Sequence, residues 1–189
     1  MPSHSSRRML WIALIFYCPM LISAFFVKPL SLLAVGPDVP DYEMQGLGLL
    51  AALAASTAIV IGSRLASRHT QWGRVLHAEL AAILSGLNSG QVLAMALLSA
   101  FGEELLFRGV AMAYLGVWGQ GAVFGLFHLP LRRALWPWTV FAVVIGIGLG
   151  WLTRWCGSLW PAVLVHFCVN YFNLHDLLDG PAPSGHPAV

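Results

Sequence analysis

Three ionisable residues stand together in the middle of a long apolar stretch. Glu103, Glu104 and Arg108 are the only charged residues between Leu80 and Leu131. At the centre of an apolar membrane helix each charge costs roughly 2.5–3.5 kcal/mol, so three unpaired charges cost on the order of 8–10 kcal/mol. That cost is comparable with the whole stability of a domain. These side chains must therefore have partners inside the protein.

The spacing of the three residues predicts one ion pair and one remaining carboxylate. On a helix, Glu104 and Arg108 are spaced i,i+4 with the acid on the favoured N-terminal side, so we expect them to pair. Glu103 lies about 100° around the helix and must face a different neighbour. A carboxylate removed from water binds a proton more strongly, which suits a general base near neutral pH. Glu103 is therefore the candidate reactive group.

Two histidines and an asparagine lie in other apolar stretches. His128 ends the segment Phe124-Gly-Leu-Phe-His, and His166 and Asn170 are spaced i,i+4. Polar groups in a membrane turn inward and therefore towards one another. His128 could orient a water molecule or protonate a leaving amine, while His166 and Asn170 could donate hydrogen bonds to an oxyanion. The chemistry indicated is amide hydrolysis inside the membrane; the alternative is a buried polar network that only fixes helix packing.

The composition places these residues in a membrane. The 189-residue chain is 58% hydrophobic and 10% charged, with a mean hydropathy of +0.76, whereas soluble domains carry roughly 25% charged residues. The net charge of +2 is small and scattered, which excludes nucleic acid as a partner. Cys18, Cys156 and Cys168 have neither metal-binding nor disulfide spacing and are expected to be buried apolar residues.

Long uncharged runs predict the membrane spans. Most of them approach the ~20 residues that cross a bilayer, and none alternates like a barrel strand. The segment 76–87 is expected to form a short interfacial helix, because Asn88, Ser89 and Gly90 after it indicate a helix stop followed by a new helix start. The prediction is an all-α polytopic membrane helix bundle with about six to seven spans, forming a single integral membrane domain over 1–189 with a disordered tail at 180–189. The predicted runs are 9–27, 47–63, 80–102, 109–131, 134–153 and 155–175.

Basic residues predict how the chain is oriented in the membrane. Arg7 and Arg8 precede the first run, and Arg64, Arg68 and Arg74 follow the second. The positive-inside rule then places the N-terminus in the cytoplasm. We expect an integral protein of a bacterial cytoplasmic membrane.

Small residues predict one close helix contact. Gly146 and Gly150 form a small-xxx-small spacing within an apolar run. Such a spacing lets two helix backbones approach closely in a membrane.

The three polar motifs together resemble a known family. Glu103-Glu104-x-x-x-Arg108, Phe124-x-x-x-His128 and His166-x-x-x-Asn170 are similar, in that order, to the motifs of the CPBP family, which comprises CAAX-processing type II prenyl endopeptidases and bacteriocin-processing or immunity proteins. The motif-bearing core covers about residues 91–174. The resemblance implies an intramembrane endopeptidase in which Glu103 activates water with help from His128. It also implies that His166 and Asn170 form an oxyanion hole and that Glu104 and Arg108 support the site.

The resemblance leaves the mechanism, the activity and the substrate open. Zinc is an alternative, since Glu103, His128 and His166 would supply three ligands and leave one open position. HExxH is absent, however, and one Glu would have to be both ligand and base, so we favour a glutamic mechanism without a cofactor. A non-catalytic membrane immunity or scaffold protein is the other alternative. The expected partners are the lipid bilayer and a membrane-embedded or lipidated peptide or protein, such as a C-terminal processing or sorting signal.

Overall fold

The computed structural model describes residues 4–27, 42–84, 86–130 and 133–179, so the predicted tail at 180–189 lies outside the described residues. Every regular element in these residues is a helix, which confirms the all-α class for this part of the chain. Helices suit a membrane because each one satisfies its own backbone hydrogen bonds, which lipid cannot do. The elements are α1 (His4–Val27), α2 (Tyr42–His69), α3 (Gln71–Leu84), α4 (Ser89–Glu104), the π-helix η2 (Leu105–Ala111), α5 (Met112–Phe127), the 3₁₀-helix η3 (Arg133–Leu135), α6 (Trp136–Cys156) and α7 (Trp160–Asp179).

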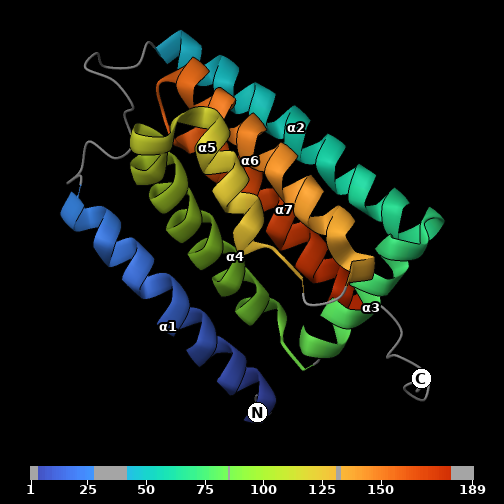
Figure 1. The fold of residues 1–189 in the computed structure, drawn as a ribbon. Coiled ribbons are helices and arrows are strands. Elements are labelled where there is room, and N and C mark those ends of the chain that lie inside the picture. Colours follow the sequence, from blue (N-terminus) through green and yellow to red (C-terminus); the bar gives the residue numbers. More distant parts are fainter. Residues whose placement is uncertain (1–3, 28–41, 85, 131–132, 180–189) are drawn as a thin grey trace.

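Helices α4 and α7 pack against each other in the interior of the bundle. Leu177, near the end of α7, packs against the apolar cluster that contains Val92, near the start of α4. Ala100, near the end of α4, and Val163, near the start of α7, belong to one other cluster. The two helices are therefore antiparallel. Helix α1 packs on α4, α2 packs on α7, and α5 packs on α6. Figure 1 shows α1 at one edge of the bundle and α2 at the opposite edge.

The boundary between α3 and α4 is set by Asn88. The Asn88 side chain accepts a hydrogen bond from the Gln91 amide at 2.9 Å, and the Gln91 side chain accepts one from the Asn88 amide at 3.0 Å. This reciprocal pair is a capping box that begins a helix. The predicted break, a helix stop followed by a new start at Asn88, is confirmed, since α3 ends at Leu84 and α4 begins at Ser89. The predicted run 80–102 is wrong at its beginning, because α4 starts at Ser89.

The boundary between α6 and α7 also differs from the prediction. Helix α6 continues to Cys156 and ends at Gly157, whose φ of +60° is the left-handed conformation that glycine supplies at helix ends. Helix α7 begins only at Trp160. The predicted run 155–175 therefore joined the last turn of one helix to the next helix, because hydropathy does not register the turn between them.

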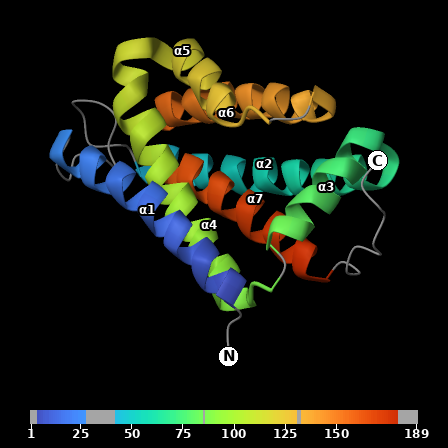
Figure 2. The ribbon, with the colours of Figure 1, turned by 60° about the horizontal axis from the view of Figure 1, so that its bottom comes forward.

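The predicted runs 80–102 and 109–131 are not separated by a loop. Helices α4, η2 and α5 follow one another directly and form one helical stretch, Ser89–Phe127. The change of direction comes later, at Gly116, whose φ of +66° and ψ of −178° are non-helical. Figure 2 shows this stretch rising from α4 and turning sharply within α5 to run beside α6. Glycine permits this turn because it lacks the Cβ that disfavours positive φ.

Three helical stretches of the described chain are long and apolar enough to cross a membrane: Glu43–His69, Ser89–Phe127 and Trp136–Cys156. Within α1, the apolar stretch Trp11–Ile22 is shorter than these three. Large apolar side chains on the outside, such as Ile15 at 72% and Leu50 at 64% exposed, fit contact with lipid rather than water. The prediction of a helical membrane protein is therefore confirmed, while the count of six to seven spans stays a prediction.

Glycines bring α5 and α6 into close contact, as Gly146 and Gly150 predict. A Cβ on Gly146 would lie 3.2 Å from the Gly121 Cα, and a Cβ on Gly150 would meet the side chain of Gln120. Small residues in α6 thus face a small residue and an amide in α5. This contact confirms the predicted close approach and positions two of the helices that surround the buried charges.

We expect Gly121→Ala to lower the thermal unfolding midpoint in detergent. The new methyl group would lie 2.9 Å from the Ile147 amide nitrogen and 3.1 Å from the Ile147 Cα, so backbone must shift. Overpacking of this kind costs about 1–3 kcal/mol. Gly148→Ala is the matched control, because nothing lies within 4 Å of its Cβ position. Equal unfolding midpoints for the two variants would contradict this account of the α5–α6 contact.

Candidate active site

The two glutamates lie where α4 changes its helical geometry. Glu103 and Glu104 are the last residues of α4, and Arg108 lies in the π-helix η2 that follows. The sequence predicted a regular helix through all three residues, and the structure corrects this. A π-helical turn is wider than an α-helical turn and is frequently found at functional sites.

Glu104 is the centre of a buried charged network. Its Oε1 accepts hydrogen bonds from Arg108 Nη1 and from His166 Nδ1, both at 2.7 Å. The guanidinium also donates from Nη2 to the carbonyl oxygen of Gly146 at 3.0 Å, and Gln120 Nε2 donates to the same oxygen at 2.8 Å. All four side chains are buried. The network joins α4, η2, α5, α6 and α7, and it gives each buried charge an opposite charge or a dipole.

The Phe124 ring packs beside Arg108 and both histidines. Its ring centroid is 4.5 Å from the Arg108 guanidinium carbon, which is a cation–π distance. The same ring lies 4.5 Å from the His128 ring and 6.1 Å from the His166 ring. The Phe124-x-x-x-His128 spacing therefore places an aromatic wall beside the polar groups.

Glu103 makes no hydrogen bond to this network, although one of its oxygens lies near His166. Its Oε1 accepts a hydrogen bond from the Tyr17 hydroxyl at 3.0 Å. Its Oε2 is buried and has no hydrogen-bond partner among the described residues. The nearest basic atoms are Nε2 of His166 at 3.8 Å and Nε2 of His128 at 3.9 Å. One carboxylate oxygen is thus held, and the other faces two imidazoles.

Both histidines use Nδ1 for structural contacts and turn Nε2 towards Glu103. His128 Nδ1 lies 2.8 Å from the Phe124 carbonyl oxygen, which can only accept, so Nδ1 carries the hydrogen. His166 Nδ1 donates in the same way to Glu104. In the neutral ring, Nε2 is then a hydrogen-bond acceptor; in the protonated ring, it is a donor. The structure brings Glu103, His128 and His166 together.

Asn170 lies one helical turn from this group. Its amide nitrogen Nδ2 donates to Ser99 Oγ at 2.8 Å. Ser99 precedes Glu103 by four residues on α4, and Asn170 follows His166 by four residues on α7. The antiparallel packing of the two helices therefore places Asn170 on the same seam as His166. The second hydrogen of the amide is not used by Ser99.

A small cavity opens beside Glu103. Its volume is about 120 Å³, and it lies among α1, α4, η2 and α5. Its lining residues are Phe16, Tyr17, Met20, Glu103, Phe107, Phe127 and His128. This cavity has room for water beside the Glu103 side chain.

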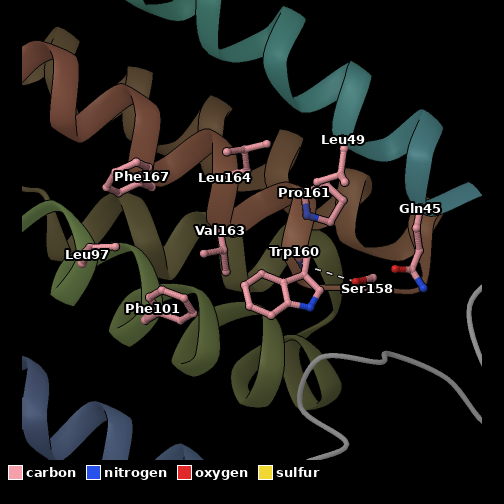
Figure 3. A pocket seen from close by; sticks show the side chains of 10 residues that line it. All are labelled: Gln45, Leu49, Leu97, Phe101, Ser158, Trp160, Pro161, Val163, Leu164 and Phe167. Carbon is pink, nitrogen blue, oxygen red and sulfur yellow. Dashed lines mark hydrogen bonds between the residues drawn. The ribbon is translucent and has the colours of Figure 1, made fainter. Parts of the chain in front are cut away.

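A larger cavity of about 360 Å³ lies elsewhere, in a groove between α2, α4 and α7 (Figure 3). Its walls are almost entirely apolar, with Gln45 and Ser158 at one end. It shares no lining residue with the cavity beside Glu103. The ionisable groups thus belong to the smaller cavity.

Three polar residues of the site were not singled out by the sequence analysis: Tyr17, Ser99 and Gln120. Each is an uncharged polar side chain within an apolar run. Uncharged polar groups in a membrane also turn inward, and this is the sequence signal that points to these three residues. Their particular partners come only from the helix packing.

The zinc alternative requires ligands that converge on one point. Tetrahedral coordination at about 2.0–2.1 Å puts neighbouring ligand atoms roughly 3.4 Å apart. The Glu103 Oε2 lies 3.8 and 3.9 Å from the two Nε2 atoms. Within the described residues, no group of three or more His, Cys, Asp or Glu side chains is placed to hold a metal ion. As placed here, these residues do not fit zinc.

The fold and the site define a helical membrane protein with a buried carboxylate facing two histidines. Comparison with known proteins agrees with that class. A family model described as Type II CAAX prenyl endopeptidase Rce1-like matches residues 85–172, a segment that contains all the motif residues. This match confirms the resemblance to the CAAX proteases over that segment, and together with the apolar helices it makes the chain an integral membrane protein.

One relative of known sequence is similar to part of the chain. The chain is 33% identical over 90 residues to "Uncharacterized protein YpbD" of Bacillus subtilis (strain 168). The aligned region is 47% of this chain and 46% of the relative, so it spans less than half the length of either protein. No solved structure matches the chain significantly.

We expect Arg108→Met to destabilise the protein strongly. The substitution removes the guanidinium and leaves the fully buried Glu104 with one positive neighbour fewer, and breaking a buried pair in this way costs about 3–5 kcal/mol. Arg64→Met is the control, since the Arg64–Asp176 pair at 2.6 Å is 44% and 35% exposed. Exposed pairs contribute about 0–1 kcal/mol. Thermal melts in detergent measure both variants, and similar losses would contradict the role given to the network.

Proposed function

We propose that the protein is an intramembrane endopeptidase in which Glu103 activates water. The observation that carries the proposal is the buried Glu103 Oε2, which lacks a hydrogen-bond partner among the described residues and faces two Nε2 atoms at 3.8 and 3.9 Å. These separations exceed the direct hydrogen-bond range of about 2.7–3.2 Å. A water molecule can bridge groups at such distances. Glu103 and His128 can therefore orient one water between them.

The reaction begins with proton transfer from this water to Glu103. As Oε2 takes the proton, the water oxygen attacks the carbonyl carbon of the scissile amide and forms a tetrahedral intermediate. When the intermediate collapses, the C–N bond breaks and the proton passes by way of His128 to the leaving amine. The cavity beside Glu103 gives the amide access to both groups.

His166 and Asn170 support the developing oxyanion. His166 donates from Nε2 when its ring is protonated, and Glu104, which accepts from Nδ1, stabilises that positive ring as the carboxylate of a catalytic triad does. Asn170 can donate its second amide hydrogen while Ser99 holds the first. With Arg108, the site then holds two negative and two positive charges, so the buried group is neutral as a whole.

The substrate we propose is a membrane-embedded or lipidated peptide or protein, such as a C-terminal processing or sorting signal. The matched family model is described as a CAAX prenyl endopeptidase, and the groups of this site can act only on a chain that enters the bundle. We further propose that the protein resides in a bacterial cytoplasmic membrane with its N-terminus in the cytoplasm. Arg64 and Arg68 near the end of α2 support that orientation through the positive-inside rule.

We expect Glu103→Gln and His128→Ala to abolish cleavage without unfolding the protein. Glutamine cannot accept the proton of water, and alanine cannot relay it. Mass spectrometry of membrane-protein C-termini, in cells that express each variant, measures cleavage. Glu43→Gln and His77→Ala make the same chemical changes outside the site and should leave the wild-type pattern of termini.

The outcome also separates the enzyme from a non-catalytic protein. Identical C-termini in wild-type and Glu103→Gln cells would contradict the proposal. If protection from a bacteriocin survived Glu103→Gln in such cells, the protein would be a membrane immunity or scaffold protein.

Chelation tests the metal-free mechanism separately. Since Glu103 and the two imidazoles do not fit zinc as placed here, we expect purified protein to keep its peptidase activity in excess EDTA or phenanthroline. A known zinc protease treated in parallel is the control. Loss of cleavage on chelation, with recovery on adding zinc, would show that the metal mechanism is correct.

A further inference from the structure

Helix α1 forms one wall of the cavity beside Glu103. Three of its seven lining residues, Phe16, Tyr17 and Met20, come from α1, although this helix lies outside the family-matched residues 85–172. Helix α1 also packs against both α4 and η2. The cavity beside Glu103 is therefore walled in part by a helix that carries none of the three motifs.

Tyr17 contacts the catalytic carboxylate directly. Its hydroxyl lies 3.0 Å from Glu103 Oε1, and since an ionised carboxylate only accepts, the hydroxyl donates. The last torsion of a glutamate side chain is broad and roughly two-fold, so the carboxylate plane is free to rotate unless a partner fixes it. Holding Oε1 fixes that plane and keeps Oε2 turned towards the two Nε2 atoms.

The fold builds a place for this tyrosine. Gly102, immediately before Glu103, has no side chain, and a Cβ there would lie 3.1 Å from Tyr17 Cδ1 and 3.5 Å from Tyr17 Cβ. The tyrosine ring thus rests directly on the backbone of α4. Phe16 packs edge-on against the same ring, with centroids 5.2 Å apart. The hydroxyl reaches the carboxylate because the ring is held on both sides.

We propose that Tyr17 is a positioning residue for Glu103, and that α1 thereby completes the active site. The proposal rests on the proposed function, because it gives Tyr17 a role in turnover through the general base. Tyr17 touches neither the bridging water nor the scissile amide. Its hydroxyl orients the base, and its ring closes one side of the cavity.

The test is the steady-state kinetics of Tyr17→Phe with a peptide substrate that the wild-type protein cleaves. Phenylalanine keeps the ring on Gly102 and removes only the hydroxyl. We expect kcat to fall about 10- to 100-fold, the loss typical of a hydrogen bond to a charged group, while KM changes less than about twofold. Tyr114→Phe, which removes a hydroxyl from an exposed tyrosine of α5 outside both cavities, should leave kcat and KM at their wild-type values.

A second measurement distinguishes positioning from a structural role. Glu103→Asp shortens the carboxylate and withdraws it from the hydroxyl, so Tyr17→Phe should lower kcat less than about twofold in that background. Tyr17→Phe should also melt above Tyr17→Ala, because it loses the hydrogen bond to Glu103 but keeps the ring on Gly102.

Three results would overturn the inference. They are a wild-type kcat in Tyr17→Phe, equal losses in the wild-type and Glu103→Asp backgrounds, and a melting temperature for Tyr17→Phe as low as that of Tyr17→Ala. In each case Glu103→Gln would still be inactive, so the proposed function would stand without Tyr17. If the wild-type protein cleaved no membrane peptide, both proposals would fail together.

Discussion

The structure depends on a buried carboxylate that is shared by a guanidinium and an imidazole. Glu104 is fully buried and accepts from both Arg108 and His166 at 2.7 Å. Removing such a charge from water is unfavourable unless its partners hold it closely. The helices that carry these partners are therefore fixed relative to one another, and the Gly146 carbonyl, which accepts from Arg108, brings α6 into the same arrangement.

This network determines what the adjacent carboxylate can do. Glu104 takes Arg108 and the Nδ1 atom of His166, whereas Glu103 takes neither and has one of its oxygens held by Tyr17. The other oxygen faces His128 and His166 across distances that suit a water molecule. Two consecutive glutamates thus have different environments, one structural and one suited to proton transfer, because they point to different neighbours.

The residues predicted the parts of this arrangement that depend on local spacing. The i,i+4 spacing of Glu104 and Arg108 predicted their contact, the small residues Gly146 and Gly150 predicted the close helix pair, and Asn88 predicted a helix start. The joint presence of two glutamates, two histidines and an asparagine in apolar runs also indicated the site residues. These signals can be read from the sequence because some depend on residues only a few positions apart on one helix. The others depend on the cost of placing a charge in an apolar setting.

Features set by long-range packing could not be predicted in this way. Tyr17 meets Glu103 across 86 residues, and no periodicity relates positions so far apart. The π-helix η2 and the turn at Gly116 both lie inside apolar runs, where hydropathy is the same for a straight and a bent helix. For the same reason, the limits of the runs around Trp155 and Gly109 were misplaced, since the boundary depends on backbone geometry rather than on composition.

The central claim is that Glu103 removes a proton from water and does not itself attack the substrate. A single turnover in ¹⁸O-labelled water, followed by mass spectrometry of the product and of the protein, tests it most directly. The account predicts that the label appears in the new carboxyl terminus of the product during the first turnover, with Glu103 unlabelled. An unlabelled product together with label in the Glu103 side chain would show attack by the carboxylate and would contradict the account.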